Sequence, residues 1–485
     1  MTDYLVHPLP EDLEGLCRAY SKATGSHAMR LASLMLRKYR HATLSDVSPE
    51  NAQSFLRLRA TVLDTLGDLA ACRAIYHFTA TMANAEGDVL GNAGALAQLH
   101  VDRSFRLDGD SEHGSPSMWE IRKVLIDIAG LVKIGEEHDA ALATQTLLHL
   151  VHGLALIGAT NDALEIVKQA ESIAPKDSSL DALTALAKAE ILSCTGHIDQ
   201  ALEQAEFILG IDSPDPLGLQ IQVRQFLGTW YRAIGNHSAA ATHLRVATQL
   251  CFQYGMEAKG VTCALELVSS LLPLGEEEEL VDIAATALDV ATELDINSEV
   301  VHALNVALIR TLYALERYSL AIQTATIAGD RACSYADPRS AVEIYDLGAQ
   351  GAIALSDYSL AAGLYATCSA LSTGESSKAR FLRLEARMLL SAEGIYEQPN
   401  TQDGNQEQDE GARQINALRA ADALLDEALT LLISTPVEDK AQAAVELAHW
   451  NHDTAWIRLR LSEAVRHLST GHDEEGDPHS DVSPR

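Results

Sequence analysis

The 485-residue sequence is short of aromatic residues, of proline and of positive charge. Aromatic residues make up only 5% of the chain and proline occupies 13 positions, so alanine, leucine, isoleucine and valine carry most of the 47% hydrophobic content. Abundant alanine and leucine with few prolines favour helix almost throughout. Lys and Arg number 36 against 68 Asp and Glu, which gives a formal net charge of −32. Such an acidic surface repels nucleic-acid phosphates and anionic lipid headgroups, so we expect neither as a direct partner.

Patterns that mark disulfide frameworks, targeting signals and membrane spans are missing too. The seven cysteines are scattered and never form C-x-x-C, which predicts reduced thiols. The first residues, MTDYLVHPLPEDLEGL, contain an early aspartate and no apolar core, unlike a signal peptide. No uncharged apolar run reaches the roughly 20 residues that a membrane-spanning helix needs. We therefore expect a soluble cytoplasmic protein without membrane insertion.

Motifs for phosphate binding and hydrolysis are likewise absent. The chain has no G-x-x-x-x-G-K-[ST] loop, no strand followed by G-x-G-x-x-G, and no G-x-S-x-G. His149 and His152, and again His449 and His452, stand three residues apart, which can place two imidazoles on one helix face. A metal site needs further ligands, and the spacing indicates none. We predict no metal, no cofactor and no enzymatic activity.

What the sequence does contain is an internal repeat. ALERYSLAIQTA begins at Ala314 and ALSDYSLAAGLY begins at Ala354, forty residues later. Alignment on the residue that follows each short turn gives spacings of 38, 39, 40, 41 and 40 between Ala163, Ala201, Ala240, Leu280, Ala321 and Ala361. A fixed period in this range is the signature of a solenoid built from stacked units.

Each unit reads as a helix, a tight turn and a second helix. In IQVRQFLGTWYRAIGNHSAAATHLRVATQL, Leu227 and Gly228 lie on the apolar stripe of the first helix, and Gly235 ends it because glycine adopts positive φ at no steric cost. Ala240 and Leu244 begin the stripe of the second helix. The small residues Gly228 and Ala240 should allow the two backbones to approach closely.

The pattern Leu-Gly-x-x-Tyr, Gly, Ala-x-x-x-Leu-x-x-Ala in residues 227–247 resembles the tetratricopeptide repeat (TPR), and residues 147–175 are similar. These units exceed the 34-residue TPR period, and the large aromatic residue near each start is mostly replaced. Longer repeats of this kind are typical of TPR-like sensor regions of bacterial regulators. The resemblance covers 144–372 well and implies an all-α fold, a right-handed superhelical α-solenoid of antiparallel helix-turn-helix repeats.

Composition divides the chain into six parts. We expect an N-terminal helical region, a polar loop, the TPR-like array, a disordered Gln- and acid-rich insertion, a C-terminal helical hairpin and a disordered acidic tail. Their respective boundaries are 1–105, 106–117, 118–390, 391–414, 415–470 and 471–485.

Candidate binding residues follow from the resemblance, because the first helix of each TPR-like unit lines the concave groove. That register places these polar residues in the groove: His149, His152, Glu190, Gln222, Gln225, Thr229, Arg232, Ser269, Arg310, Tyr313, Asp346 and Gln350. Arg232 and Arg310 could each hold a carboxylate of a ligand bidentately. Alternatively, each is a solvated arginine paired with a neighbouring acid. The two-Lys, two-Asn clamp of some chaperone-binding TPR proteins is not recognisable.

One basic stretch stands out from the acidic chain. Between Gly15 and Ser45 there is no Asp or Glu, whereas Arg30, Arg37, Lys38 and Arg40 are all present. This stretch is either an ordinary exposed helix face or a docking surface for an acidic partner or for the protein's own acidic tail.

These features predict a non-enzymatic adaptor that binds a peptide segment of another protein in the concave groove. The alternative is a regulatory sensor that binds a small molecule or signalling peptide and controls a partner such as a transcription regulator.

Overall fold

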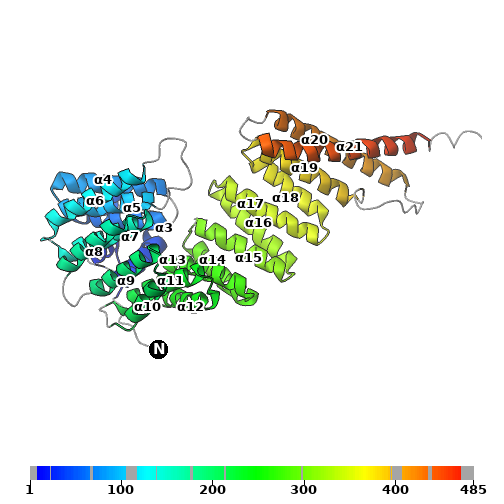
Figure 1. The fold of residues 1–485 in the computed structure, drawn as a ribbon. Coiled ribbons are helices and arrows are strands. Elements are labelled where there is room, and N and C mark those ends of the chain that lie inside the picture. The colour runs from blue at the N-terminus through cyan, green and yellow to red at the C-terminus, as the bar shows by residue number, and fades with distance from the viewer. Residues whose placement is uncertain are drawn as a thin grey trace, which may run out of the picture. The chain divides into compact units, whose positions relative to one another are not determined.

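The computed structural model describes residues 8–21, 23, 25–65, 69–104, 117–137, 139–174, 179–211, 215–296, 299–393, 395, 407–434 and 440–470. Within these residues every regular element is a helix and no strand occurs (Figure 1). The chain divides into two compact units, Met1–Leu304 and Asn305–Arg485. No described helix combines the length and the apolar character that crossing a bilayer requires.

The first unit begins with shorter helices and continues as successive helix pairs. Its elements are α1 (Leu13–Tyr20), α2 (Gly25–Tyr39), the 3₁₀ turns η1 (Leu44–Asp46) and η2 (Pro49–Asn51), α3 (Ala52–Thr65), α4 (Leu69–Glu86), α5 (Val89–Ser104), α6 (Met118–Gly135), α7 (Ala140–Leu156), α8 (Thr160–Ile173), α9 (Ser179–Cys194), α10 (Ile198–Ile208), α11 (Pro216–Ala233), α12 (His237–Gln253), α13 (Glu257–Leu271), η3 (Leu272–Leu274) and α14 (Glu277–Glu293). Each helix packs against the next along the chain, and α5 packs against both α6 and α7.

A left-handed residue closes the turn between successive helices in the repeats. In the first unit this position is glycine at Gly158, Gly196, Gly235, Gly255 and Gly275, with φ between 68° and 85°, and it is Asp295, with φ of 57°, after α14. Backbone N–H groups at each turn return to carbonyls of the preceding helix, as in the bond from Gly235 N to Arg232 O at 2.9 Å. A left-handed turn residue therefore recurs through the array, as it does at the end of many helices.

The packing inside one repeat follows the predicted pattern. Leu227, Ala240 and Leu244 are fully buried. A Cβ atom added to Gly228 would lie only 2.3 Å from Leu244 Cγ, so the glycine allows the first helix to approach the second as closely as it does. The apolar stripes of α11 and α12 thus face one another, which is the arrangement expected of an antiparallel helical hairpin.

The second unit continues the repeats and ends in two long helices. Its helices are α15 (Glu299–Ala314), α16 (Tyr318–Ser334), α17 (Pro338–Ala354), α18 (Tyr358–Leu371), α19 (Glu375–Ala392), α20 (Glu407–Ser434) and α21 (Lys440–Thr470). The boundary between the two units falls within α15. The two Ala-Leu-x-x-Tyr-Ser-Leu-Ala stretches occupy equivalent places, at the α15–α16 and α17–α18 turns. Here the left-handed turn residues are Glu316, Ala336 and Ser356 rather than glycine.

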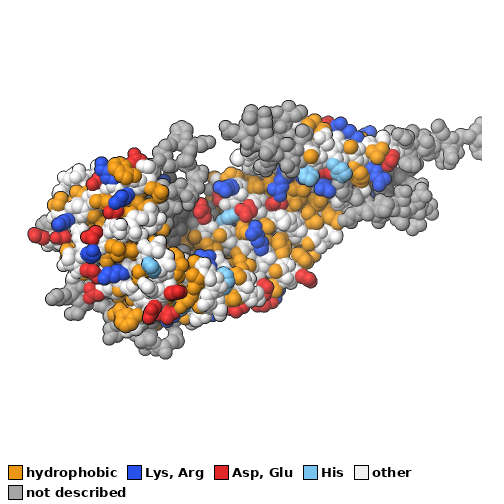
Figure 2. Space-filling view, in the orientation of Figure 1, with side chains coloured by type: hydrophobic (Ala, Val, Ile, Leu, Met, Phe, Trp, Pro, Cys, Tyr) orange, Lys and Arg blue, Asp and Glu red, His pale blue; other side chains and the backbone are white. Residues whose placement is uncertain are grey.

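These hairpins confirm the predicted all-α fold of antiparallel helix-turn-helix repeats. Most of the loop expected at 106–117, and the tail expected at 471–485, lie outside the described residues. Of the insertion expected at 391–414, helix extends into both ends, because α19 runs to Ala392 and α20 starts at Glu407. On the face shown in Figure 2, side chains of both charges are interspersed with apolar ones.

Candidate functional site

The first helices of four successive hairpins, α7, α9, α11 and α13, pack against one another in the first unit. We call the surface that they form the first-helix face. His152 Nδ1 of α7 lies 2.5 Å from Glu190 Oε1 of α9. His152 and Glu190, which the sequence predicts separately as groove residues, are thus joined across neighbouring repeats.

A second polar link joins α11 to α13 on this face. Gln225 Nε2 donates to Glu266 Oε1 at 2.6 Å, and Thr229 Oγ1 donates to Glu266 Oε2 at 3.2 Å. The sequence reasoning placed Gln225 and Thr229 in the groove but missed Glu266, their common acceptor. The carboxylate of Glu266 orients two of the candidate side chains and leaves their donors satisfied.

The remaining candidates of the first unit differ in what they contact. Ser269 Oγ donates to Leu265 O of its own helix at 2.8 Å, so its hydroxyl is satisfied locally. Arg232 is half-buried near the end of α11, and its side chain forms no hydrogen bond or ion pair with the residues that the structure describes. Arg232, which the sequence predicts to lie in the groove, is thus not paired with any described acid.

In the second unit two of the four candidates are held by their neighbours. The Tyr313 hydroxyl donates to Leu347 O of α17, and burial raises the pKa of Tyr313 to about 12. Asp346 accepts from Arg380 Nη2 of α19 at 3.3 Å. Arg310 and Gln350 are exposed, and within the described part of the chain neither side chain has a hydrogen bond or ion pair.

The predicted basic face lies on α2 and meets acids of the protein's own repeats. Arg37 Nη2 lies 3.0 Å from Glu257 Oε1 at the start of α13, and Arg40 Nη1 lies 2.7 Å from Asp295 Oδ2 after α14. The pKa of Arg30 is lowered by burial, with Glu257 acting in the opposite direction. Lys38 is exposed. Arg37 and Arg40 are thus paired with acids of the same chain, while the expected acidic tail lies outside the described residues.

The start of α2 is fixed by one carboxylate on α11. Asp215 accepts from Ser26 N and from Ser26 Oγ, both at 2.7 Å, and it also accepts from Gly218 N at 3.0 Å. One side chain therefore caps the N-termini of α2 and α11 together, which is favourable because the first N–H groups of a helix have no partner within it. Helix α2 consequently packs on α11 and α13, covering part of the first-helix face.

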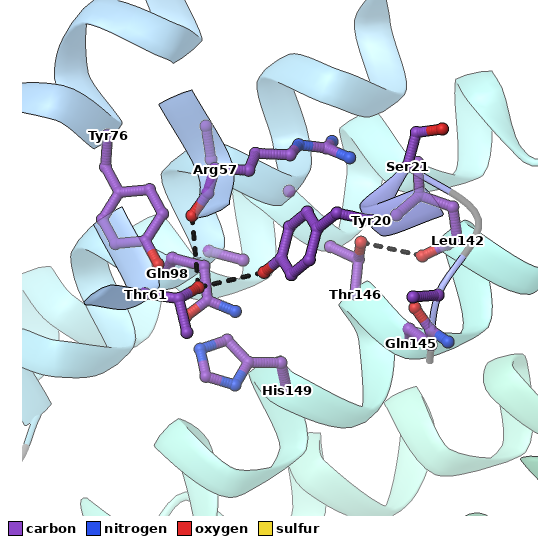
Figure 3. Close-up of a pocket in the computed structure, with 14 residues that line it drawn as sticks. Tyr20, Ser21, Arg57, Thr61, Tyr76, Gln98, Leu142, Gln145, Thr146 and His149 are labelled. Atoms are coloured by element: carbon purple, nitrogen blue, oxygen red, sulfur yellow. Dashed lines mark hydrogen bonds between the residues drawn. The ribbon is translucent and has the colours of Figure 1, made fainter. Parts of the chain in front are cut away.

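A cavity of about 210 Å³ lies between the N-terminal helices and the first repeats (Figure 3). Its lining residues come from α1, α3, α4, α5 and α7 and from the residues that follow α1. They are Tyr20, Ser21, Ala23, Arg57, Thr61, Tyr76, Gly94, Ala95, Ala97, Gln98, Leu142, Gln145, Thr146 and His149. Tyr20 reaches Thr61 of α3, with 3.0 Å between their oxygens (Figure 3). Ser21 and Gln98 are exposed, so the cavity opens to solvent on their side.

His149 is a member of this cavity as well as a predicted groove residue. In Figure 3 its ring projects toward Thr61 and Gln98. Its Nε2 atom is buried and has no hydrogen-bond partner. Burial, reinforced by nearby His152, lowers the pKa of His149 to about 4, so the imidazole is neutral at pH 7. A buried neutral imidazole with an unused nitrogen can donate to or accept from a ligand.

An adjoining cavity of about 300 Å³ shares Tyr20, Ala23 and Gln145 with the first and also contacts the predicted residue Gln222. No periodic signal in the sequence indicated either cavity, since residues from several separated helices build both. Among the described residues no group of three or more His, Cys, Asp or Glu side chains is arranged to hold a metal ion.

No protein-family model and no curated protein sequence matches this chain. Among solved structures it is similar to apo RapI, at 12% identity and a TM-score of 0.45 over 79% of this chain and 99% of that one. It is also similar to yeast Tom70, at 12% identity and a TM-score of 0.34 over 91% and 88% of the two chains. A signal-transduction ATPase with a tetratricopeptide repeat sensor from Pyrococcus horikoshii matches at 10% identity and a TM-score of 0.33, over 91% and 74%. The TPR-like organisation is evident in this chain's own hairpins and recurring turns.

Proposed function

We propose that the protein is a non-enzymatic interaction adaptor that binds an extended, carboxylate-bearing peptide segment of a partner along the first-helix face. The observation that carries this proposal is the environment of Arg232. This arginine stands three residues after Thr229 and seven after Gln225, so all three lie on one side of α11. Thr229 and Gln225 are satisfied by Glu266, whereas Arg232 has no acidic partner among the described residues.

The protein has 68 acidic residues for 36 lysines and arginines, so acids are in excess. Arg232 nevertheless pairs with none of the described acids. The planar guanidinium matches the geometry of a carboxylate and forms two parallel hydrogen bonds with it. A peptide side chain or C-terminus of this type is therefore the ligand chemistry that Arg232 supports. Arg310, exposed on the second unit, offers the same chemistry there.

The test is selection of random dodecapeptides displayed on phage against the full-length protein and against variants. We expect enriched peptides to carry Asp, Glu or a free C-terminus and to bind Arg232→Glu at least about tenfold more weakly, because charge reversal removes the pair and adds repulsion. Arg419→Glu is the matched control, since Arg419 is an exposed arginine of α20, which carries none of the predicted groove residues. Arg310→Glu is measured separately.

Enriched peptides that bind Arg232→Glu and wild type equally would contradict a site at Arg232. Failure to enrich any peptide would contradict peptide binding altogether. The alternative function, a regulatory sensor controlling a partner such as a transcription regulator, is favoured by the cavity beside α1. It predicts that a small molecule alters peptide affinity, whereas an adaptor binds its peptide equally with and without one.

A further inference from the structure

The cavity between the N-terminal helices and α7 has a charge composition opposite to that of the whole protein. Its described lining residues include one arginine, one histidine and several uncharged polar groups, but no Asp or Glu. The chain as a whole carries 68 acidic residues against 36 basic ones. A cavity without acids in such a chain favours anionic molecules over cationic ones.

Arg57 supplies the positive charge of this cavity. Its side chain is half-buried and forms no hydrogen bond or ion pair with the described residues. A guanidinium stays protonated at every physiological pH and carries five N–H donors. A Cβ atom built on Gly94 of α5 would lie 3.6 Å from Arg57 Nη2, so the glycine leaves room beside the guanidinium. A guanidinium with unused donors can form two parallel hydrogen bonds with a carboxylate.

Uncharged donors and acceptors surround the arginine. The buried Nε2 of His149 has no partner, and Gln98 and Gln145 place side-chain amides in the lining. Tyr20 contributes a hydroxyl that is already paired with Thr61. These groups can orient the polar remainder of a small ligand, because each can donate or accept a hydrogen bond.

We propose that this cavity binds a small carboxylate, with the guanidinium of Arg57 pairing with the carboxylate group. The volume of about 210 Å³ is below that of sites for drug-sized ligands, so the occupant is a compact metabolite rather than a peptide. The proposal goes beyond the adaptor function and does not depend on it, since Arg232 lines neither this cavity nor the adjoining one.

Isothermal titration calorimetry of the full-length protein tests the proposal, with acetate, succinate and L-glutamate as probes. Acetamide and succinamide serve as uncharged counterparts of acetate and succinate, with nearly the same shape. We expect at least one carboxylate to bind and to bind about tenfold or more tightly than its amide. Arg57→Gln should weaken binding about tenfold or more, while Arg57→Lys should retain part of it because charge remains without the planar fork.

Two further variants separate binding from folding. Gly94→Met keeps Arg57 but fills the cavity beside it, and it should abolish binding. Arg339→Gln removes one exposed arginine that lines no described cavity and should leave binding unchanged. Circular dichroism of each variant serves as the control that its helical content is kept.

Absence of binding by all three carboxylates would overturn the proposal. Equal binding of succinate and succinamide would also overturn it, because the charge would not be recognised. The proposal fails too if folded Arg57→Gln and Gly94→Met bind as wild type does. Loss of binding in Arg232→Glu but not in Arg57→Gln would instead place the carboxylate on the first-helix face.

Discussion

The close approach of α11 and α12 predicts an unusual response to a single methyl group. In most exposed helix positions Gly→Ala is stabilising by roughly 0.5–1 kcal/mol, because glycine loses more backbone entropy on folding. At Gly228 the added Cβ would lie 2.3 to 2.9 Å from three atoms of Leu244, which is fully buried. Insertion of a methyl group into a packed core costs about 1–3 kcal/mol. We therefore expect Gly228→Ala to be destabilising by about 0.5–2 kcal/mol in spite of the helix-propensity gain.

Gly363 provides the matched comparison. It lies within α18, is exposed, and has nothing within 4 Å of the position that its Cβ would occupy. Gly363→Ala should therefore be stabilising by roughly 0.5–1 kcal/mol. In a Leu244→Ala background the obstructing side chain is gone, so Gly228→Ala should also become stabilising there, a non-additivity typical of residues in contact.

Urea unfolding, monitored by circular dichroism, measures the change in the free energy of unfolding of the whole protein. Hydrogen exchange of the amides in α11 and α12 measures the stability of this hairpin separately. If Gly228→Ala stabilises the protein as much as Gly363→Ala does, the proposed close approach of the two helices is refuted. The close approach would also be refuted if the effects of Gly228→Ala and Leu244→Ala on the free energy of unfolding simply add in the double variant.

Three other outcomes follow from single residues. Ser356 has φ of 59° at its turn, and Ser356→Gly should be stabilising by about 0.5–1 kcal/mol in urea unfolding, since the left-handed conformation is costly for side chains with a Cβ. Burial lowers the pKa of His149 to about 4 in the folded protein, from about 6.5 in the unfolded chain, so between these pH values the unfolded chain binds one more proton than the folded one. Stability should therefore fall as pH drops from about 6.5 toward 4, and it should fall less in His149→Gln. An unchanged pH profile in the variant would contradict this. Cys194 and Cys333 are both exposed, but partial desolvation of the Cys194 thiol and the nearby charge of Glu190 raise the pKa of Cys194. Mass-mapped iodoacetamide labelling at pH 7.5 should therefore reach Cys333 first, and the reverse order would contradict this.

The repeat fold was predictable because its determinants are local. Gly235 marks a turn by its conformational freedom alone, and Ala240 and Leu244 recur at helical spacing within one segment. Both effects act over fewer than about ten residues, so one sequence shows them directly. The non-glycine turn at Ser356 was found only because the surrounding Ala-Leu-x-x-Tyr-Ser-Leu-Ala pattern repeats.

The candidate sites were less predictable because their partners are distant in sequence. Gln225 meets Glu266 across 41 residues, and Arg37 meets Glu257 across 220. Helical register indicates which side of a helix a residue occupies, but it does not identify the acid that faces it on another repeat. The same limit applies to the cavity, where Arg57 and His149 come together from helices that no periodic pattern associates.

The cap that Asp215 provides for both α2 and α11 determines when α2 can pack on the later helices during synthesis. Ser26 precedes its acceptor by 189 residues. At about 5–20 residues per second, a ribosome delivers Asp215 roughly 10–40 s after the start of α2 has been made. Glu257 and Asp295, which pair with the other end of this helix, are delivered later still. A helix translated among the first segments of the protein can pack on α1 and α3 early, but it must wait for most of the first unit before it can dock on α11 and α13.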